Sequence, residues 1–384
     1  MDTLVSKLLC AAAFTFAAGA NVYGQSSNSC CPAPKPDCCP PRFEQGMPLC
    51  CDTYPRAFNA PARIDVTGCS DWDVYGSFIY WHVSQESMDV GVKSFFDPTI
   101  PTDGATFPTT IAFQTFKYKP GFKVGAGFSF GDDGWVCFAE YTRLHQKTVF
   151  SRTVTAPTFW APTDWFALGF VEGSTGDTAY RPTTLTAKWK MNFDRVDLSF
   201  SRPFYQGKRI TVSPYGGMRG LWITQVETLA LNPNTASVAT AVLRSHCWSV
   251  GPNGGVETNW LVGWGFRFEG MAGASLLYTR YTTTAVKQTV TAISSSDGVP
   301  ESLNAINNNV NVLRPMMEMG VGIGWGTYLS CQEWYMDLSV RYDFLQLWDQ
   351  NVMRHYTIGV NSGVAVPADN MQMHGITATA RFDF

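Results

Sequence analysis

Apolar and polar residues alternate with a period of two over most of the chain from residue 71 onward. In residues 334–347, every even position from Trp334 to Phe344 is apolar, and the odd positions carry three charged residues. Residues 121–130 and 313–325 repeat the pattern, with glycine and charged residues on the polar face. This alternation predicts β-strands whose two faces differ in chemistry. We therefore expect an all-β fold built from amphipathic strands.

The connections between these segments alternate between short and long. Ten segments carry the strand pattern: residues 72–84, 118–130, 135–149, 183–202, 208–226, 243–257, 262–284, 309–327, 332–348 and 372–384. Short turns on one side and long loops on the other are typical of bacterial outer-membrane barrels. The prediction is a transmembrane antiparallel β-barrel of about 10–12 strands, or more, because the longest connections have room for further strands. Even strand parity places both termini in the periplasm and the long loops at the cell surface.

One segment breaks the simple alternation. Trp189, Met191 and Phe193 fall on odd positions, whereas Val196 and Leu198 fall on even positions. A β-bulge near residue 194 would reconcile the two halves, because a bulge adds one residue to one strand.

Composition agrees with a membrane barrel and excludes membrane helices. Charged residues make up 15% of the chain and aromatic residues 14%, whereas soluble domains have roughly 25% charged residues. No run of 18 apolar residues follows the N-terminus, as a spanning helix would require. The net charge of −3 argues against nucleic acid or anionic lipid as the main partner. The expected partner is the lipid of the outer membrane.

The N-terminus reads as an export signal. Lys7 precedes an apolar stretch of 13 residues from Leu8 to Ala20, which is too short to span a bilayer. We predict a signal peptide at residues 1–24, with cleavage before Gln25. Lipidation at Cys10 is disfavoured because no small residues precede it.

Residues 25–70 form a second region, rich in cysteine and proline, before the barrel at residues 71–384. The disulfide candidates are Cys30, Cys31, Cys38, Cys39, Cys50, Cys51 and Cys69. Ten cysteines remain after signal removal, and an oxidising compartment favours disulfides, either within the protein or to neighbouring envelope proteins. A metal site is a weaker alternative because the C-x-x-C spacing of zinc sites is absent, and free thiols are a third. The dense prolines predict an extended, irregular periplasmic arm. Cys137, Cys247 and Cys331, within or beside strands, are interpreted as small buried residues.

The last strand ends in an aromatic residue. Phe382 and Phe384 alternate with Arg381 and Asp383 at the end of the chain. A terminal aromatic on an amphipathic strand resembles the signal that delivers outer-membrane barrels to their assembly machinery, which we therefore expect as a partner.

Two segments resemble a known family. Residues 189–205 combine a Trp-led strand with an Asp-Leu step and an aromatic turn, and residues 210–222 follow with a Pro-Tyr-Gly-Gly-Met-Arg strand. Together with residues 140–145, they resemble the Legionella-type major outer membrane protein (MOMP-like) family. The resemblance implies porin activity, surface exposure, adhesion to host cells and homo-oligomers. The Cys-Cys-Pro arm is more similar to cysteine-rich chlamydial envelope proteins, whose outer membranes are held together by disulfides.

The charged residues of the inward face are the functional candidates, since mixed charges line water-filled pores. The predicted lumen-lining residues are Lys123, Glu140, Arg143, Arg195, Asp197, Arg219, Arg267, Glu269, Arg314, Glu318, Asp337, Arg341, Arg381 and Asp383. The same charges would equally pair across a closed lumen. His355 with Asp349 or Asp369 is the only acid–base candidate, and a solvated loop histidine is the simpler interpretation.

The sequence therefore predicts a porin for small hydrophilic solutes that is also a disulfide-linked component of the envelope. The alternative is a closed structural or adhesive barrel that displays surface loops. We expect no enzymatic activity, no metal and no cofactor.

Overall fold

The computed structural model describes residues 62, 64, 66, 72–96, 106–130, 134–161, 182–232, 238–291, 301–307, 309–353 and 368–384. The predicted signal peptide, His355 and the arm with its seven cysteines (Cys30, Cys31, Cys38, Cys39, Cys50, Cys51 and Cys69) lie outside the described residues.

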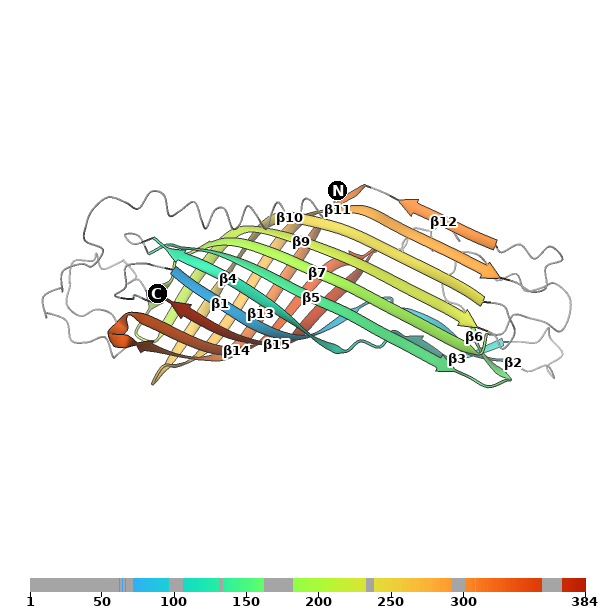
Figure 1. Cartoon of the computed structure of the whole chain (residues 1–384), viewed down its shortest axis with the longest axis horizontal. Helices are drawn as coiled ribbons and strands as arrows, with labels where there is room; N and C mark the ends of the chain where they lie inside the picture. The colour runs from blue at the N-terminus through green and yellow to red at the C-terminus, as the bar shows by residue number, and fades with distance from the viewer. Residues whose placement is uncertain are drawn as a thin grey trace, which may run out of the picture.

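Ten antiparallel strands form a closed barrel (Figure 1). They are β1 (Trp72–Gln85), β4 (Tyr118–Ser129), β5 (Val136–Thr153), β7 (Thr184–Ser201), β9 (Ile210–Asn232), β10 (Val238–Gly263), β11 (Phe266–Thr291), β13 (Val310–Leu329), β14 (Trp334–Asn351) and β15 (Asp369–Asp383). The first strand closes the ring because β1 pairs with both β15 and β4. The all-β antiparallel barrel predicted from the alternation is confirmed, and each of the ten predicted segments corresponds to one of these strands. In the part of the chain that the structure describes, no helix is long and apolar enough to cross a membrane.

Further short strands come from three of the long connections and one short one. Strands β2 (Asp89–Phe96), β3 (Thr106–Phe113) and β6 (Thr158–Ala161) form a separate sheet in the order β3-β2-β6. Strand β12 (Glu301–Asn307) pairs with β11, β8 (Phe204–Gln206) pairs with β9, and a 3-10 turn (Ser330–Gln332) joins β13 to β14. The three-stranded sheet and β12 lie at the end of the barrel farthest from the C-terminus (Figure 1). We call this end the distal end and the end with Phe384 the proximal end.

Strand β7 runs the length of the barrel without a bulge. Its registers with β5 and β9 are continuous from Thr184 to Ser201, so the bulge predicted near Asp194 is wrong. Odd positions point inward throughout: Trp189 and Phe193 are fully buried, and Arg195 and Asp197 are nearly so. The apolar positions switch from odd to even because the apolar surroundings of β7 lie inside the barrel in its distal half and outside the barrel in its proximal half. The backbone register does not shift.

The outer face of the proximal half is an apolar belt. Its members are exposed apolar side chains: Val74, Phe78, Phe122, Val124, Leu198, Phe200, Met218, Val250, Leu276, Val321, Ile323, Leu338, Val340 and Ile376. Aromatic residues edge the belt on its distal side: Tyr80, Tyr118, Trp222, Trp248, Tyr278 and Tyr342. We call this row the aromatic girdle; Tyr80 stacks on Tyr118 with ring centroids 5.4 Å apart. A lipid-facing apolar band flanked by aromatic girdles is the pattern of transmembrane barrels.

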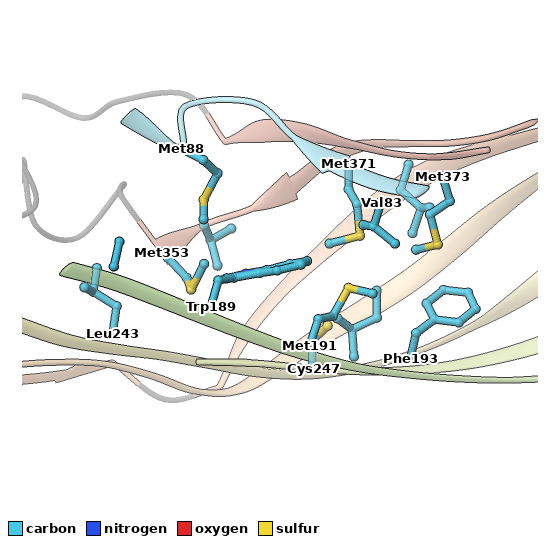
Figure 2. Packing of buried hydrophobic residues seen from close by; sticks show 14 of the residues in the cluster. Val83, Met88, Trp189, Met191, Phe193, Leu243, Cys247, Met353, Met371 and Met373 are labelled. Atoms are coloured by element: carbon cyan, nitrogen blue, oxygen red, sulfur yellow. The ribbon is translucent and has the colours of Figure 1, made fainter. Parts of the chain in front are cut away.

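The interior of the distal half is filled by an apolar plug. It consists of Ile79, Trp81, Val83, Leu144, Trp189, Met191, Phe193, Leu221, Ile223, Leu243, Leu277, Met316, Leu345, Leu347, Met371 and Met373, each at most 2% exposed. Figure 2 shows Trp189 and several methionine thioethers pointing into this common space from different strands. Fully burying one such side chain stabilises a fold by roughly 1.5–3 kcal/mol. The polarity of the two faces thus reverses along the barrel axis. The outer face is apolar in the proximal half, and the interior is apolar in the distal half.

Candidate functional site in the barrel interior

The structure places most of the predicted lumen residues on the inner face. Thirteen of the fourteen occupy inward positions: Lys123, Glu140, Arg195, Asp197, Arg219, Arg267, Glu269, Arg314, Glu318, Asp337, Arg341, Arg381 and Asp383. Arg143 is the exception. Its side chain is 46% exposed, and its Nε lies 3.7 Å from Oδ1 of Asp194 on the outer face. Arg143 is three residues from Glu140, and residues an odd number apart in a strand point to opposite faces.

A central network of ion pairs fills the barrel just proximal to the plug. Arg195 contacts Glu140 at 2.7 Å, Asp197 at 3.0 Å and Glu318 at 3.0 Å. Arg219 contacts Asp197 and Glu318, each at 2.6 Å. Glu318 lies on β13, three strands away from Arg219 on β9, so these bonds cross the lumen. They join strands that are not neighbours in the sheet and so brace the barrel across its interior.

A second ion pair crosses the lumen in the same layer. Nζ of Lys123 on β4 lies 3.4 Å from Oδ2 of Asp343 on β14. Asp343 also accepts hydrogen bonds of 2.6 Å from Arg341 and from the hydroxyl of Thr377. Lys123 lies over the ring of Trp81 at 4.9 Å from its centroid, a cation–π contact. The charged layer is therefore in direct contact with the apolar plug.

A third cluster lies nearer the proximal end. Arg267 pairs with both oxygens of Asp337 and contacts Glu269 at 2.5 Å. Arg381 contacts Asp383 at 2.5 Å and Asp73, on the adjacent strand, at 3.6 Å. Planar guanidinium groups suit this bidentate pairing with carboxylates.

Sequence reasoning missed four interior acidic residues: Asp73, Glu227, Glu257 and Asp343. Two of them share the inward parity of a predicted residue on the same strand, Asp343 with Arg341 on β14 and Glu227 with Arg219 on β9, and this signal could have found them. Asp343 belongs to the polar face of residues 334–347, and Asp73 pairs with Arg381. Glu257 makes no ion pair within the described part of the chain.

A small polar cavity remains inside the charged layer. Its volume is about 50 Å³, and its lining includes Glu257, Tyr215, Asn253 and Arg341 together with the central network. This is room for a few water molecules. The cavity does not reach through the plug, whose side chains are excluded from solvent.

Glu227 is different because it lies in the distal half, beyond the aromatic girdle. Its side chain is fully buried, and neither carboxyl oxygen has a hydrogen-bond partner within the described residues. Burial without a partner raises the pKa of the Glu227 carboxyl well above its usual range. Glu227 therefore favours its neutral form in this apolar surrounding.

The described residues include two free thiols and no metal-ligand cluster. Among them, no group of three or more His, Cys, Asp and Glu side chains is arranged to hold a metal ion. Cys137 and Cys247 are free thiols, and Cys247 is buried, where it accepts a hydrogen bond of 3.2 Å from Gln350. The interior thus combines an ion-paired layer with an apolar plug.

Comparison with known proteins identifies the family. The model of the Legionella pneumophila major outer membrane protein precursor matches residues 67–384. The chain belongs to this family. Membership confirms the resemblance seen in residues 189–222 and places the barrel in the lipid of the outer membrane. The search of curated proteins gave no match.

Solved structures that resemble this family member are outer-membrane barrels of low sequence identity. The protease OmpT of Escherichia coli is 8% identical, with 82% of this chain and 96% of that chain covered and a TM-score of 0.36. The toluene transporter TodX of Pseudomonas putida is 7% identical, with 82% and 89% covered and a TM-score of 0.27. The attachment protein Ail of Yersinia pestis is 9% identical, with 81% and 98% covered and a TM-score of 0.19.

Proposed function

We propose that this family member is a closed structural barrel of the outer membrane, whose distal half carries surface segments, and that it holds no open pore. This is the alternative that the sequence left open beside the porin. The observation that carries it is the apolar plug. Trp81, Trp189 and Phe193 are 0% exposed at the level where a hydrophilic solute would have to pass.

The strand number supports the same conclusion. About eight strands leave an interior just wide enough for side chains, whereas sixteen leave an aqueous channel. A ring of ten strands is close to the smaller case. The charged layer supports closure as well, because Arg219 and Glu318 bridge the lumen at 2.6 Å.

A porin is the second candidate, and the polar cavity favours it. Glu257 is exposed within the interior although it lies on an inward position of β10, so water reaches part of the charged layer. A conducting state would require the plug to move aside. The disulfide-linked arm, the surface position of the long loops and the absence of enzymatic activity remain predictions alongside either candidate.

Single-channel conductance separates the two candidates. The purified protein is refolded into a planar bilayer and recorded under reducing and then oxidising conditions, with heat modifiability as the check of folding. We expect a folded barrel that is silent in both conditions. Discrete, reproducible conductance steps would overturn the closed barrel and establish a porin, and a step size that changes with redox conditions would tie the cysteine arm to gating.

A further inference from the structure

The outer face of β5 and β7 carries a basic patch just beyond the aromatic girdle. The patch consists of Arg143, His145, Lys147, Lys188 and Lys190, all of which are exposed. The two strands pair in a continuous antiparallel register, in which Arg143 lies opposite Asp194 and Lys147 lies opposite Lys190. Four cationic side chains therefore gather on two adjacent strands, and His145 among them accepts a hydrogen bond of 3.0 Å from Nε of Arg143.

Few negative charges balance this patch. Asp194 is the only acidic residue among the described outward positions of β5, β7 and β9 beyond the girdle. It accepts a hydrogen bond of 2.6 Å from Tyr141 and lies 3.7 Å from Arg143. Within the described part of the chain, the three lysines make no ion pair.

The direct opposition of Lys147 and Lys190 is unfavourable for the isolated protein. Side chains directly opposite each other in an antiparallel pair have Cβ atoms about 4.5–5.5 Å apart, and like charges there destabilise the sheet. An anion between the two ammonium groups would turn this repulsion into attraction. Lysine is a common phosphate binder because its three N–H groups act as a compact charge.

The height of the patch on the barrel indicates which anion it meets. Asp194 lies opposite Trp222 of the aromatic girdle, and girdle aromatics sit at the membrane–water interface. Lys190 is four residues farther along β7, which is about 13 Å along the strand. The patch thus begins at the edge of the apolar belt and rises into the layer of lipid headgroups.

We propose that the β5–β7 basic patch binds the phosphate groups of a phosphorylated membrane lipid. Lys147 and Lys190 hold one phosphate between them, and Arg143 and His145 contact the same headgroup nearer the acyl chains. The apolar belt below the patch, with Val196 and Leu198 on the same face of β7, meets the acyl chains. The protein thereby fixes a lipid on one side of the barrel, whether or not the interior conducts.

Native mass spectrometry of the refolded barrel tests this proposal with diphosphoryl lipid A and its dephosphorylated form as probes. The two probes have the same acyl chains, so a preference between them reports phosphate recognition. We expect tighter binding of the diphosphoryl form. Lys147→Gln with Lys190→Gln should weaken that binding about 10- to 30-fold, because a cation near an anionic surface contributes roughly 1 kcal/mol.

Two further variants make the result specific. Lys208→Gln with Arg209→Gln removes the same charge from exposed positions at the proximal end and should leave binding unchanged. Lys147→Arg with Lys190→Arg should retain it. Equal binding of both lipid forms, or an equal loss in the proximal control, would overturn the proposal. Full competition by millimolar inorganic phosphate would also overturn it, since it would indicate a site for soluble anions.

Discussion

At the residue scale, the interior and exterior arginines should differ sharply in their contribution to stability. Arg219 is 2% exposed and pairs with Asp197 and Glu318. Arg219→Met removes one of the two cations that pair with Asp197 and Glu318 and leaves both buried carboxylates to Arg195 alone, which costs up to about 3–5 kcal/mol. Arg143→Met breaks one exposed pair, worth about 0–1 kcal/mol. Urea unfolding in lipid vesicles, followed by tryptophan fluorescence, measures both. Similar losses for the two variants would contradict the central network as a structural brace.

Sequence parity predicted most of the interior charges but not their partners. Alternation assigned Lys123 and Glu318 to the inner face because a strand has only two faces. It could not reveal that Lys123 meets Asp343, because that pair joins residues 220 positions apart. Arg143 was assigned to the wrong face because Tyr141 and Thr142, which separate it from Glu140, show no clear alternation of apolar and polar residues. Both charged residues were therefore placed on the inner face, although they lie three positions apart along β5.

At the element scale, the outer face of a strand should tolerate a charged side chain outside the apolar belt but not within it. Ala378 on β15 points outward at mid-belt, level with Phe78 and Val340, and Ala230 on β9 points outward in the distal half. Ala378→Lys should cost about 2–4 kcal/mol of unfolding free energy. Ala230→Lys, the same substitution outside the belt, should cost less than about 0.5 kcal/mol. Equal costs in vesicle unfolding would mean that the belt edge is misplaced.

The ten strands were predictable because their period of two is independent of which face is apolar. The bulge at Asp194 was predicted wrongly because the apolar face was assumed to be the lipid face along the whole of β7. Phe193 and Val196 are both apolar, yet one faces the interior and the other faces lipid. A local sequence pattern does not carry the distance of a residue from the membrane, so it could not distinguish these two environments.

At the scale of the whole molecule, closure depends on two changes of polarity, one on the outer face and one in the interior, that occur at the same level of the barrel. Outside, the belt ends at the aromatic girdle; inside, the charged layer ends at the plug, at the same level of the barrel. The interior change of polarity was not predicted, because the plug joins residues from all around the barrel, from Trp81 on β1 to Met373 on β15. The proximal half presents its apolar side chains to lipid, whereas the distal half buries most of its apolar side chains inside, as a soluble β-protein does.

Opening the plug should therefore create a pore that the native barrel lacks. Trp81 and Trp189 are its two largest members, and both are 0% exposed. Trp81→Ala with Trp189→Ala removes two indole rings from the distal interior and leaves the belt and the central ion pairs in place. We expect conductance steps in a planar bilayer from this variant, with a loss of stability of about 3–5 kcal/mol for each truncated ring.

The matched control truncates two tryptophans of the girdle, Trp222→Ala with Trp248→Ala, which face outward and should leave the barrel silent. If the plug variant folds, as heat modifiability reports, and still does not conduct, then the plug is not what closes the barrel. Closure would then rest on the cross-lumen pairs of Arg195 and Arg219 with Glu318. Adding Glu318→Gln to the Trp81→Ala and Trp189→Ala variant would then produce conductance, because the neutral amide forms no ion pair with either arginine.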